Sequence, residues 1–276
     1  MARTYLRAHM PERSERQSFL GVESDAVLAA THVAVVGLGG GGSHIAQQLA
    51  HVGVGRFSLL DPEASAAVNL NRQVGTTVED VGLGRSKVES ALRLIKSVSP
   101  DASVRAIQAK WQDEPLALRD ADVIVGCLDS FGARFQLEGA ARRFLTPYVD
   151  LGMDVREIAG GFAIFGQAAL SLPGHLCLQC MAVIREDDLA RERYGAAGGR
   201  PQVVWSNGLL ASAAVGLIVE LLTPWFSPAP HSVLLTYEGN SQELKRHVWV
   251  GSHGSDGCPH YSFEQTGDPF FEVLSR

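Results

Sequence analysis

A glycine-rich stretch close to the N-terminus constrains the fold more than any other feature of the chain. It is Val35-Val36-Gly37-Leu38-Gly39-Gly40-Gly41-Gly42-Ser43, and it ends an apolar run that begins at residue 32. Residues with helical spacing follow directly. Glycines let the backbone turn tightly and bring its N–H groups against a ligand, and the start of a helix favours an anion. The stretch therefore predicts a strand, a glycine turn and a helix around a nucleotide phosphate.

Predicted strands alternate with predicted helices as far as residue 151. This alternation favours an α/β class with a Rossmann-like, mostly parallel sheet that has helices on both faces. Apolar runs predict strands over 33–37, 56–60, 102–109, 123–127 and 147–151. Helical spacing predicts helices over 24–30, 43–51 and 85–98, and a further helix that includes 137–145.

The pattern changes after residue 151. We expect a hairpin that turns at Gly166, with strands over 158–165 and 167–172. An apolar helix over 209–222 and late strands over 233–237 and 244–250 follow. The chain has no internal repeat and no low-complexity linker, so we expect one domain over 1–276. Its parts are an N-terminal arm (1–30), a nucleotide-binding core (31–172), a cysteine knuckle with a crossover loop (173–208), and a late helix, strands and tail (209–276).

Composition and charge exclude several classes of protein. The net charge is −6 with both signs interspersed, which argues against general binding to nucleic acid or to an anionic membrane. The longest apolar run, 209–222, carries Glu220 and stops at Pro224, short of the ~20 residues of a membrane span. Residues 1–16 are charged and unlike a signal peptide, and the four cysteines do not form a disulfide framework. We expect a soluble, cytoplasmic protein.

The glycine turn matches the dinucleotide-binding fingerprint in the form Gly37-x-Gly39-x-x-Gly42. Asp61 lies at the end of the second predicted strand, about 20 residues farther on, where a carboxylate can bind ribose hydroxyls. This pattern alone does not distinguish NAD from ATP. An NAD-dependent oxidoreductase therefore stays open as an alternative, and so does a plain tight turn without a ligand.

Polar side chains that suit a triphosphate follow the strand ends. Asn69 and Arg72 come after the second strand, and Lys87 lies near the start of the next helix. Cations are needed where charge builds up on an attacked phosphate. Asp129 directly follows the fourth strand and is placed to hold Mg²⁺, although it or Ser130 could instead cap the next helix. Solvated surface charges are the plainer alternative for each residue.

Cys177-x-x-Cys180 is half of a zinc knuckle. The tail offers Cys258-Pro259-His260-Tyr261, where a tyrosine stands in the place of a second thiolate. Three thiolates and His260 could still complete a tetrahedron around Zn²⁺, or the cysteines could be buried without a metal. Cys127 lies on a predicted strand and is expected to be a core thiol.

These motifs together resemble the ThiF/MoeB/HesA family, the bacterial relatives of ubiquitin-activating enzymes. The resemblance runs from about residue 13 to residue 222, and the segment that matches NLxRQ is its most specific part. The four matches are Gly37-Leu38-Gly39-Gly40-Gly41-Gly42-Ser43, Asp61 with Asn69-Leu70-Asn71-Arg72-Gln73, Gly84-Arg85-Ser86-Lys87-Val88, and Asp129-Ser130-Phe131-Gly132-Ala133-Arg134, in which serine replaces the asparagine of DNxxxR.

The resemblance implies an adenylyltransferase that binds ATP and Mg²⁺. In such enzymes the C-terminal carboxylate of a ubiquitin-like or sulfur-carrier protein, or of a peptide, attacks the α-phosphate, and pyrophosphate leaves. Asp61 would hold the ribose, and Asp129 would hold Mg²⁺. The residues that the resemblance assigns to ATP are Gly37, Gly39, Gly40, Gly42, Ser43, Asp61, Asn69, Arg72, Lys87, Asp129 and Ser130, and those it assigns to catalysis are Arg16, Arg72, Lys87 and Asp129.

The resemblance also implies partners. Family members are typically homodimers in which an N-terminal arginine, here Arg16, reaches the ATP of the neighbour. Thioester-forming members carry a cysteine between the knuckle and the late helix, but residues 181–208 contain none. We therefore expect the acyl adenylate to pass to a nucleophile on a conjugating or sulfur-transfer protein. The glycine-rich stretch 195–201 would cross over a small-residue tail of the substrate, or it is a surface loop. A non-catalytic dimeric scaffold is the remaining alternative.

Overall fold

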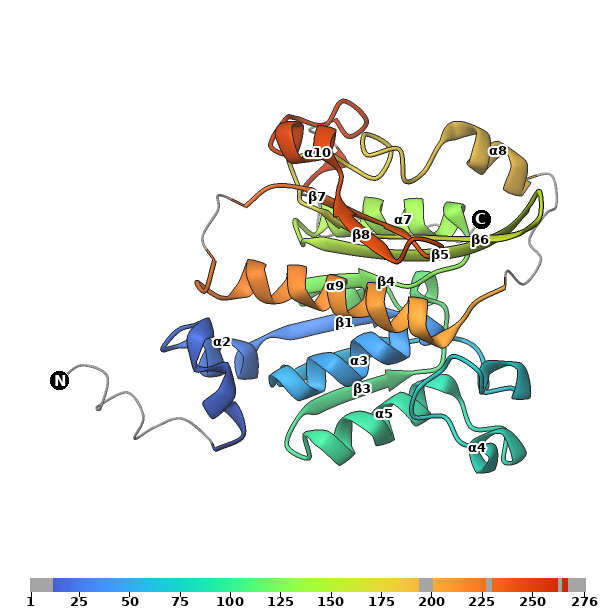
Figure 1. Cartoon of the computed structure of the whole chain (residues 1–276). Coiled ribbons are helices and arrows are strands. Elements are labelled where there is room, and N and C mark those ends of the chain that lie inside the picture. Colours follow the sequence, from blue (N-terminus) through green and yellow to red (C-terminus); the bar gives the residue numbers. More distant parts are fainter. Residues whose placement is uncertain (1–11, 194–200, 227–229, 263–264, 268–276) are drawn as a thin grey trace.

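The computed structural model of the chain describes residues 12–193, 201–226, 230–262 and 265–267 (Figure 1). One sheet of eight strands runs through the molecule in the order β3-β2-β1-β4-β5-β6-β7-β8. The first five of these are parallel and the last three antiparallel, which confirms the predicted Rossmann-like α/β class. The strands are β1 (His32–Val36), β2 (Arg56–Leu60), β3 (Ser103–Ile107), β4 (Val123–Gly126), β5 (Tyr148–Ile158), β6 (Gly161–Ser171), β7 (Val233–Glu238) and β8 (Glu243–Arg246).

Helices cover both faces of the sheet, as predicted. Figure 1 shows α3 (Gly40–Val52), α5 (Lys87–Val98) and α9 (Val204–Leu222) on one side, and α7 (Phe131–Arg143) on the other. The shorter helices are η2 (Glu12–Leu20), α2 (Ser24–Ala30), η3 (Ala67–Asn69), α4 (Val78–Gly82), η4 (Trp111–Asp113), α6 (Leu116–Arg119), α8 (Glu186–Arg193) and α10 (Val248–His253).

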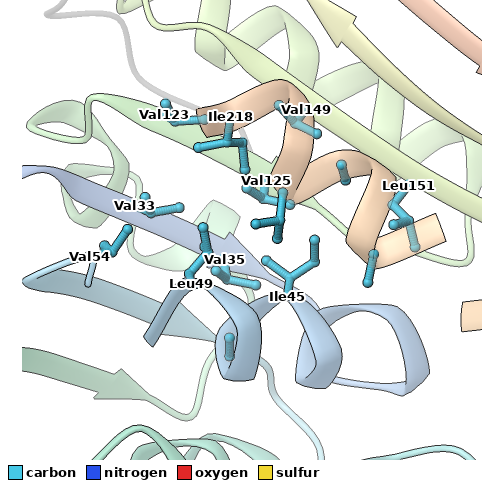
Figure 2. Close-up of a cluster of buried hydrophobic side chains, with 14 of the residues drawn as sticks. Val33, Val35, Ile45, Leu49, Val54, Val123, Val125, Val149, Leu151 and Ile218 are labelled. Atoms are coloured by element: carbon cyan, nitrogen blue, oxygen red, sulfur yellow. The ribbon is translucent and has the colours of Figure 1, made fainter. Parts of the chain in front are cut away.

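The strand residues alternate between two hydrophobic cores. Val33 and Val35 of β1 pack against Ile45 and Leu49 of α3 in the first core (Figure 2). Ala34 and Val36 belong to the second core, under α7. Because β1 is buried on both faces, its sequence is continuously apolar, as expected for a central parallel strand.

The order of the strands reverses between β1 and β4, and the chain leaves β1 there through the glycine turn. Gly37 has a φ of +87°, and a Cβ on it would lie 2.5 Å from the carbonyl oxygen of Cys127. A Cβ on Gly42 would lie only 1.8 Å from the carbonyl oxygen of Gly37. Glycine is therefore required at both positions by the turn itself, before any ligand is considered.

Several predicted boundaries are wrong, including the start of the apolar helix, which begins at Val204 and not at residue 209. Helix α3 starts at Gly40, because three of the glycines form its first turn. The predicted strand 147–151 continues as β5 to Ile158, and the hairpin turns at Ala159 and Gly160, the latter with positive φ, and not at Gly166. Gly166 lies within β6, where a Cβ would come 2.3 Å from the side chain of Leu210 on α9. The predicted strand 244–250 ends as β8 at Arg246, and α10 begins at Val248.

Helix α9 is long and apolar enough to span a membrane, and it is the one such helix among the described residues. Half of this stretch is buried inside the molecule. The helix packs against α3 and against strands β5 and β6. These contacts account for its apolar sequence as that of a core helix.

Candidate functional site

A cavity of about 1510 Å³ opens at the carboxyl ends of the parallel strands, where the strand order reverses. Open α/β sheets bind their ligands at this position. The cavity brings together predicted site residues from four separate stretches of the chain. Those that line it are Gly37, Gly39, Gly40, Asp61, Asn69, Arg72, Lys87, Asp129 and Ser130.

Asp61 lies at the end of β2 and is almost fully buried. Its carboxylate accepts hydrogen bonds from the N–H of Leu38 in the glycine turn (2.7 Å) and from the N–H of Glu63 (2.9 Å). Burial raises the pKa of Asp61, and the charge of Lys87 and the two N–H groups oppose that rise. The carboxylate therefore fixes the glycine turn to β2 and lies at the cavity wall.

Lys87 and Arg72 supply positive charge to the cavity. Lys87 is the first residue of α5, and its buried ammonium forms an ion pair with the exposed carboxylate of Glu63. Arg72 donates to the carbonyl oxygen of Val68 (2.5 Å) and to the side chain of Asn71 (3.0 Å). Among the described residues, the partners of Arg72 are close to it in the sequence and the partner of Lys87 is an exposed side chain. A phosphate could replace these partners.

Two of the predicted ligand-binding residues, Ser43 and Asn69, make hydrogen bonds within the fold in this structure. The buried hydroxyl of Ser43 donates to the carbonyl oxygen of Gly40 (3.0 Å) and accepts from the N–H of Val74 (3.1 Å). It thereby ties the segment after η3 to α3. Neither Ser43 nor Gly42 is among the residues that line the cavity. Asn69 lines it, but its side-chain oxygen accepts the N–H of Ala66 (2.9 Å).

Asp129 is exposed on the cavity wall just beyond β4, as predicted. One of its oxygens accepts a hydrogen bond from Nε2 of Gln202 (3.2 Å). An exposed carboxylate of this kind fits a Mg²⁺ ion that is shared with phosphates. Ser130 caps α7 by accepting the N–H of Ala133 (3.2 Å), so the alternative role of this position as a helix cap is confirmed for Ser130.

The start of α7 also binds a side chain that the sequence reasoning missed. Glu192 of α8 accepts hydrogen bonds from the N–H groups of Phe131 (2.8 Å) and Gly132 (2.9 Å), and from the hydroxyl of Ser130 (3.1 Å). Helix N-termini bind carboxylates in this way. The contact fixes α8 beside the cavity.

A buried ion pair lies at the cavity wall, which Arg134 lines. Arg134 of α7 binds both oxygens of Asp150 on β5, and Tyr148 donates to the same carboxylate (3.1 Å). The charge of Asp150 keeps the pKa of Arg134 high in spite of its burial. Cys127, predicted to be a core thiol, is partly buried and also lines the cavity, and burial raises the pKa of its thiol, which stays protonated at neutral pH.

Several other cavity residues were not predicted from the sequence. Glu63 is two residues from Asp61, and a search for acidic neighbours of the fingerprint carboxylate could have found it. Gln202 lies just before α9 and Asn207 in its first turn, far along the chain, and only the fold brings them to the glycine turn. One face of the β5–β6 hairpin also lines the cavity, with Gly152, Asp154, Arg156, Phe165 and Gln167.

The structure brings together the four predicted zinc ligands. Cys177, Cys180, Cys258 and His260 have all their ligand atoms within 4.8 Å of one another. The sulfur atoms of Cys177 and Cys180 are 3.6 Å apart, and those of Cys180 and Cys258 are 3.8 Å apart. Four ligands at zinc distances in a tetrahedron require sulfur separations of about 3.8 Å. The cluster therefore fits Zn²⁺.

Side chains from α7 hold the backbone of this cluster. The buried carboxylate of Glu138 accepts the N–H of Leu178 (2.9 Å) and the hydroxyl of Tyr261 (3.4 Å). Arg142 stacks on the ring of Tyr261, with 4.7 Å from its guanidinium carbon to the ring centre. Tyr261, which stands where a fourth cysteine was expected, thus packs beside the cluster and leaves His260 as the fourth ligand.

Arg16 is not among the residues that line the cavity of its own chain. Its neighbour Gln17 donates to the carbonyl oxygen of Val52 (3.4 Å), at the end of α3 opposite the glycine turn. Figure 1 shows this N-terminal segment at the end of the sheet away from α8. The glycine-rich stretch predicted to cross over the substrate lies, for residues 195–200, outside the described part of the chain.

Fold and site define a class: a Rossmann-like α/β protein with a polar cavity at the reversal of its strand order and a Cys₃His cluster at the far end of α7. The chain belongs to the ThiF family, whose model matches residues 12–259.

Curated relatives support this assignment over most of the chain. The molybdopterin-synthase adenylyltransferase of Escherichia coli is 31% identical over 231 residues, covering 83% of this chain and 87% of that protein. The Escherichia coli sulfur carrier protein ThiS adenylyltransferase is 30% identical, with coverage of 87% and 89%. The match to the SAMP-activating enzyme E1 of Haloferax volcanii is 31% identical and covers 59% of this chain and 57% of that protein. These names confirm the expectation of an enzyme of the adenylyltransferase type.

Solved structures confirm the fold. Escherichia coli MccB with ATP superposes with a TM-score of 0.73 at 19% identity, over 91% of this chain and 73% of that chain. The same protein with MccA-N7isoASN gives a TM-score of 0.73 at 20% identity, over 88% and 72%.

Proposed function

We propose that the chain adenylates the C-terminal carboxylate of a ubiquitin-like or sulfur-carrier protein, or of a peptide, using ATP and Mg²⁺. The observation that carries the proposal is the convergence of Asp61, Arg72, Lys87 and Asp129 with the glycine turn in one cavity. At about 1510 Å³ the cavity exceeds the ~300–1,000 Å³ of ordinary small-molecule sites. It has room for a peptide tail beside a nucleotide.

In the proposed step an oxygen of the substrate carboxylate attacks the α-phosphorus of ATP. The bond from the α-phosphorus to the bridging oxygen breaks, and pyrophosphate leaves with the electron pair. Lys87 and Arg72 stabilise the charge on the phosphates, and Asp129 holds Mg²⁺, which neutralises further charge when bound. No general base is required, because a carboxylate is already ionised at neutral pH. Catalysis is then positioning and charge stabilisation.

The relatives and structural neighbours support the substrate class. Two of the relatives are adenylyltransferases, one named for molybdopterin synthase and one for the sulfur carrier protein ThiS. Among the solved structures, Escherichia coli MccB occurs with ATP and with MccA. Together these proteins favour ATP over NAD as the nucleotide and leave both a small protein and a peptide as substrates.

We further propose a homodimer of single-domain chains over 1–276, in which Arg16 completes the site of the neighbour. Because residues 181–208 lack cysteine, the acyl adenylate passes directly to a nucleophile of a conjugating or sulfur-transfer partner. The Cys₃His cluster binds Zn²⁺ and fixes the C-terminal tail to the start of the segment after β6.

Pyrophosphate exchange into ATP tests the proposal. Small proteins with a Gly-Gly C-terminus are tested as substrates, and mass spectrometry detects the adenylated tail. We expect exchange that requires both the substrate and Mg²⁺ and that is lost in Asp129→Ala. Pyrophosphate exchange at the wild-type rate in that variant would show that Asp129 does not hold the metal. Tight binding of NAD without Mg²⁺, with no exchange for any tail, would instead support the oxidoreductase.

A further inference from the structure

The segment that enters α9 and the first turn of that helix place two primary amides between the glycine turn and Asp129. Gln202 donates through Nε2 to the Asp129 carboxylate (3.2 Å). Its Oε1 accepts from Nδ2 of Asn207 (3.5 Å), and Nδ2 of Asn207 also donates to the carbonyl oxygen of Val203 (3.0 Å). Asn207 is almost fully buried, and both amides line the cavity. They form one chain of hydrogen bonds from α9 to Asp129.

The same amides lie against the glycine turn. A Cβ on Gly40 would lie 2.4 Å from Nδ2 of Asn207 and 3.1 Å from Oε1 of Gln202. Gly40 is the first residue of α3, where phosphate is expected, and Asp129 is where the metal is expected. The amide pair therefore spans the two parts of the site that must act on one nucleotide.

We propose that Gln202 is a positioning residue that orients the Asp129 carboxylate toward a divalent cation, and that Asn207 holds Gln202 in place. This inference rests on the proposed function of the cavity. A carboxylate on an exposed loop end rotates freely unless one oxygen is held. The single amide hydrogen bond takes one acceptor site and leaves the other lone pairs for a cation.

The chemistry of the donor set favours this role over substrate binding by Gln202 itself. Its N–H and its carbonyl are already directed to Asp129 and Asn207. An amide also carries no charge, so it orients the carboxylate and leaves its negative charge for a cation. An arginine or lysine in the same place would neutralise that charge. Partners behind a metal ligand commonly change metal affinity or activity by about 10- to 100-fold.

The test measures binding of a non-hydrolysable ATP analogue by calorimetry over a series of Mg²⁺ concentrations, with no substrate protein present. Gln202→Met keeps the length of the side chain and removes its hydrogen bonds. We expect the Mg²⁺ concentration at half effect to rise about 10-fold, while the affinity for the analogue in EDTA stays at the wild-type value. Asn207→Leu should shift the Mg²⁺ dependence in the same direction by a smaller factor.

Gln136→Met is the matched control, because Gln136 makes an exposed hydrogen bond with Gln112 (3.1 Å) and does not line the cavity. It should bind Mg²⁺ and the analogue as the wild type does. An unchanged Mg²⁺ dependence in Gln202→Met would overturn the inference, and so would an equal loss of affinity with and without Mg²⁺. Failure of the proposed function would give a different result. The chain would then bind the analogue in a Mg²⁺-dependent way but would show no substrate-dependent pyrophosphate exchange.

Discussion

Gly42 shows at the scale of one residue how the turn and the site differ. It does not line the cavity, yet a Cβ there would lie 1.8 Å from a backbone oxygen of the same turn. Gly42→Ala should therefore destabilise the fold by several kcal/mol, on the order of the cost of severe overpacking, ~3 kcal/mol or more. Urea unfolding followed by circular dichroism measures this free energy.

Gly216 provides the matched control for that substitution. It lies within α9, and a Cβ there would meet nothing within 4 Å. Gly216→Ala should stabilise the helix by up to about 1 kcal/mol, because alanine loses less backbone entropy than glycine. If Gly42→Ala unfolds at the same urea concentration as wild type, the steric account of the turn is wrong.

The ion pair between Lys87 and Glu63 predicts opposite effects of two substitutions on ATP binding. Lys87 is buried and Glu63 is exposed, so the carboxylate competes with a phosphate for the ammonium. Glu63→Gln should tighten ATP binding about three- to tenfold, since a change of ~1 kcal/mol is near fivefold. Lys87→Met should weaken it by at least tenfold.

Calorimetry at low and high salt checks both values. The gain in Glu63→Gln should shrink as salt screens the exposed charge. Weaker ATP binding in Glu63→Gln would mean that Glu63 positions Lys87 and does not compete with the ligand.

At the scale of elements, α4 and α5 are joined by one buried carboxylate. Asp80 of α4 accepts hydrogen bonds from Arg93 and Arg85, and from Thr77 at the helix start. The network fixes the segment before α5, the helix that carries Lys87. Asp80→Asn should lower the free energy of unfolding by about 2 kcal/mol at pH 7, the usual value of a hydrogen bond to a charged group.

The same carboxylate predicts a pH dependence. Hydrogen bonds from Arg93 hold the pKa of Asp80 well below its ordinary value of 3.8. The folded protein thus binds fewer protons at Asp80 than the unfolded chain, so this stabilisation is complete above about pH 5 and declines as the pH falls through 4. The difference between wild type and Asp80→Asn should shrink over that range.

Glu79→Gln is the control for this series, because Glu79 is exposed and pairs weakly with Arg85 at 3.4 Å. It should change stability by less than about 0.5 kcal/mol. A difference between wild type and Asp80→Asn that stays constant down to pH 3 would refute the assignment of the low pKa.

The elements differ in how far the sequence could predict them. Periodicity located β2 to the residue, because its apolar run ends sharply at Asp61. The sequence pattern wrongly predicted the hairpin turn at Gly166. Glycine is needed at that position because the side chain of Leu210 approaches it closely. A glycine required by a neighbouring helix is indistinguishable in sequence from one required by a turn.

The same limit applies to the site. Asp61, Arg72, Lys87 and Asp129 follow strand ends or open a helix, so their convergence could be predicted from the topology alone. Gln202 reaches Asp129 only because α9 returns across the glycine turn, a contact between positions 73 residues apart. No local sequence pattern predicts such a contact.

At the scale of the whole molecule, the Cys₃His cluster joins the C-terminal tail to the segment after β6. The hydrogen bond between Cys177 and Cys258 raises the pKa of the first thiol and lowers that of the second to about 4. Removal of zinc by a chelator should lower the Tm, because an ion at 100-fold over its Kd adds about 2.7 kcal/mol of stability. That loss corresponds to roughly 5–10 °C.

Differential scanning calorimetry with and without the chelator measures the effect, and added Zn²⁺ should restore the Tm. Cys258→Ser should abolish the response, whereas Cys127→Ser should keep it because Cys127 lies outside the cluster. Elemental analysis that finds no zinc in the purified chain, with no change in Tm on adding it, would leave the cluster as free thiols.

The position of Arg16 makes a prediction about the assembly. Gln17, the neighbour of Arg16, donates to Val52 at the end of α3 opposite the glycine turn, and Arg16 does not line the cavity of its own chain, so the proposed function places Arg16 in the site of a second copy. Arg16→Ala and Asp129→Ala should each lose pyrophosphate exchange as homodimers. After subunit exchange, half of the dimers are mixed, and each mixed dimer has one site with both residues intact. Activity should therefore recover to about a quarter of the wild-type value in a two-fold symmetric dimer.

Lys87→Ala mixed with Asp129→Ala is the control for this experiment. Both residues line the same cavity of one chain, so no arrangement of two such chains contains an intact site, and the mixture should stay inactive. Recovery in this control would mean that the two cavities exchange residues other than Arg16. Full activity of Arg16→Ala alone would remove Arg16 from the site, whatever the oligomeric state measured by analytical ultracentrifugation.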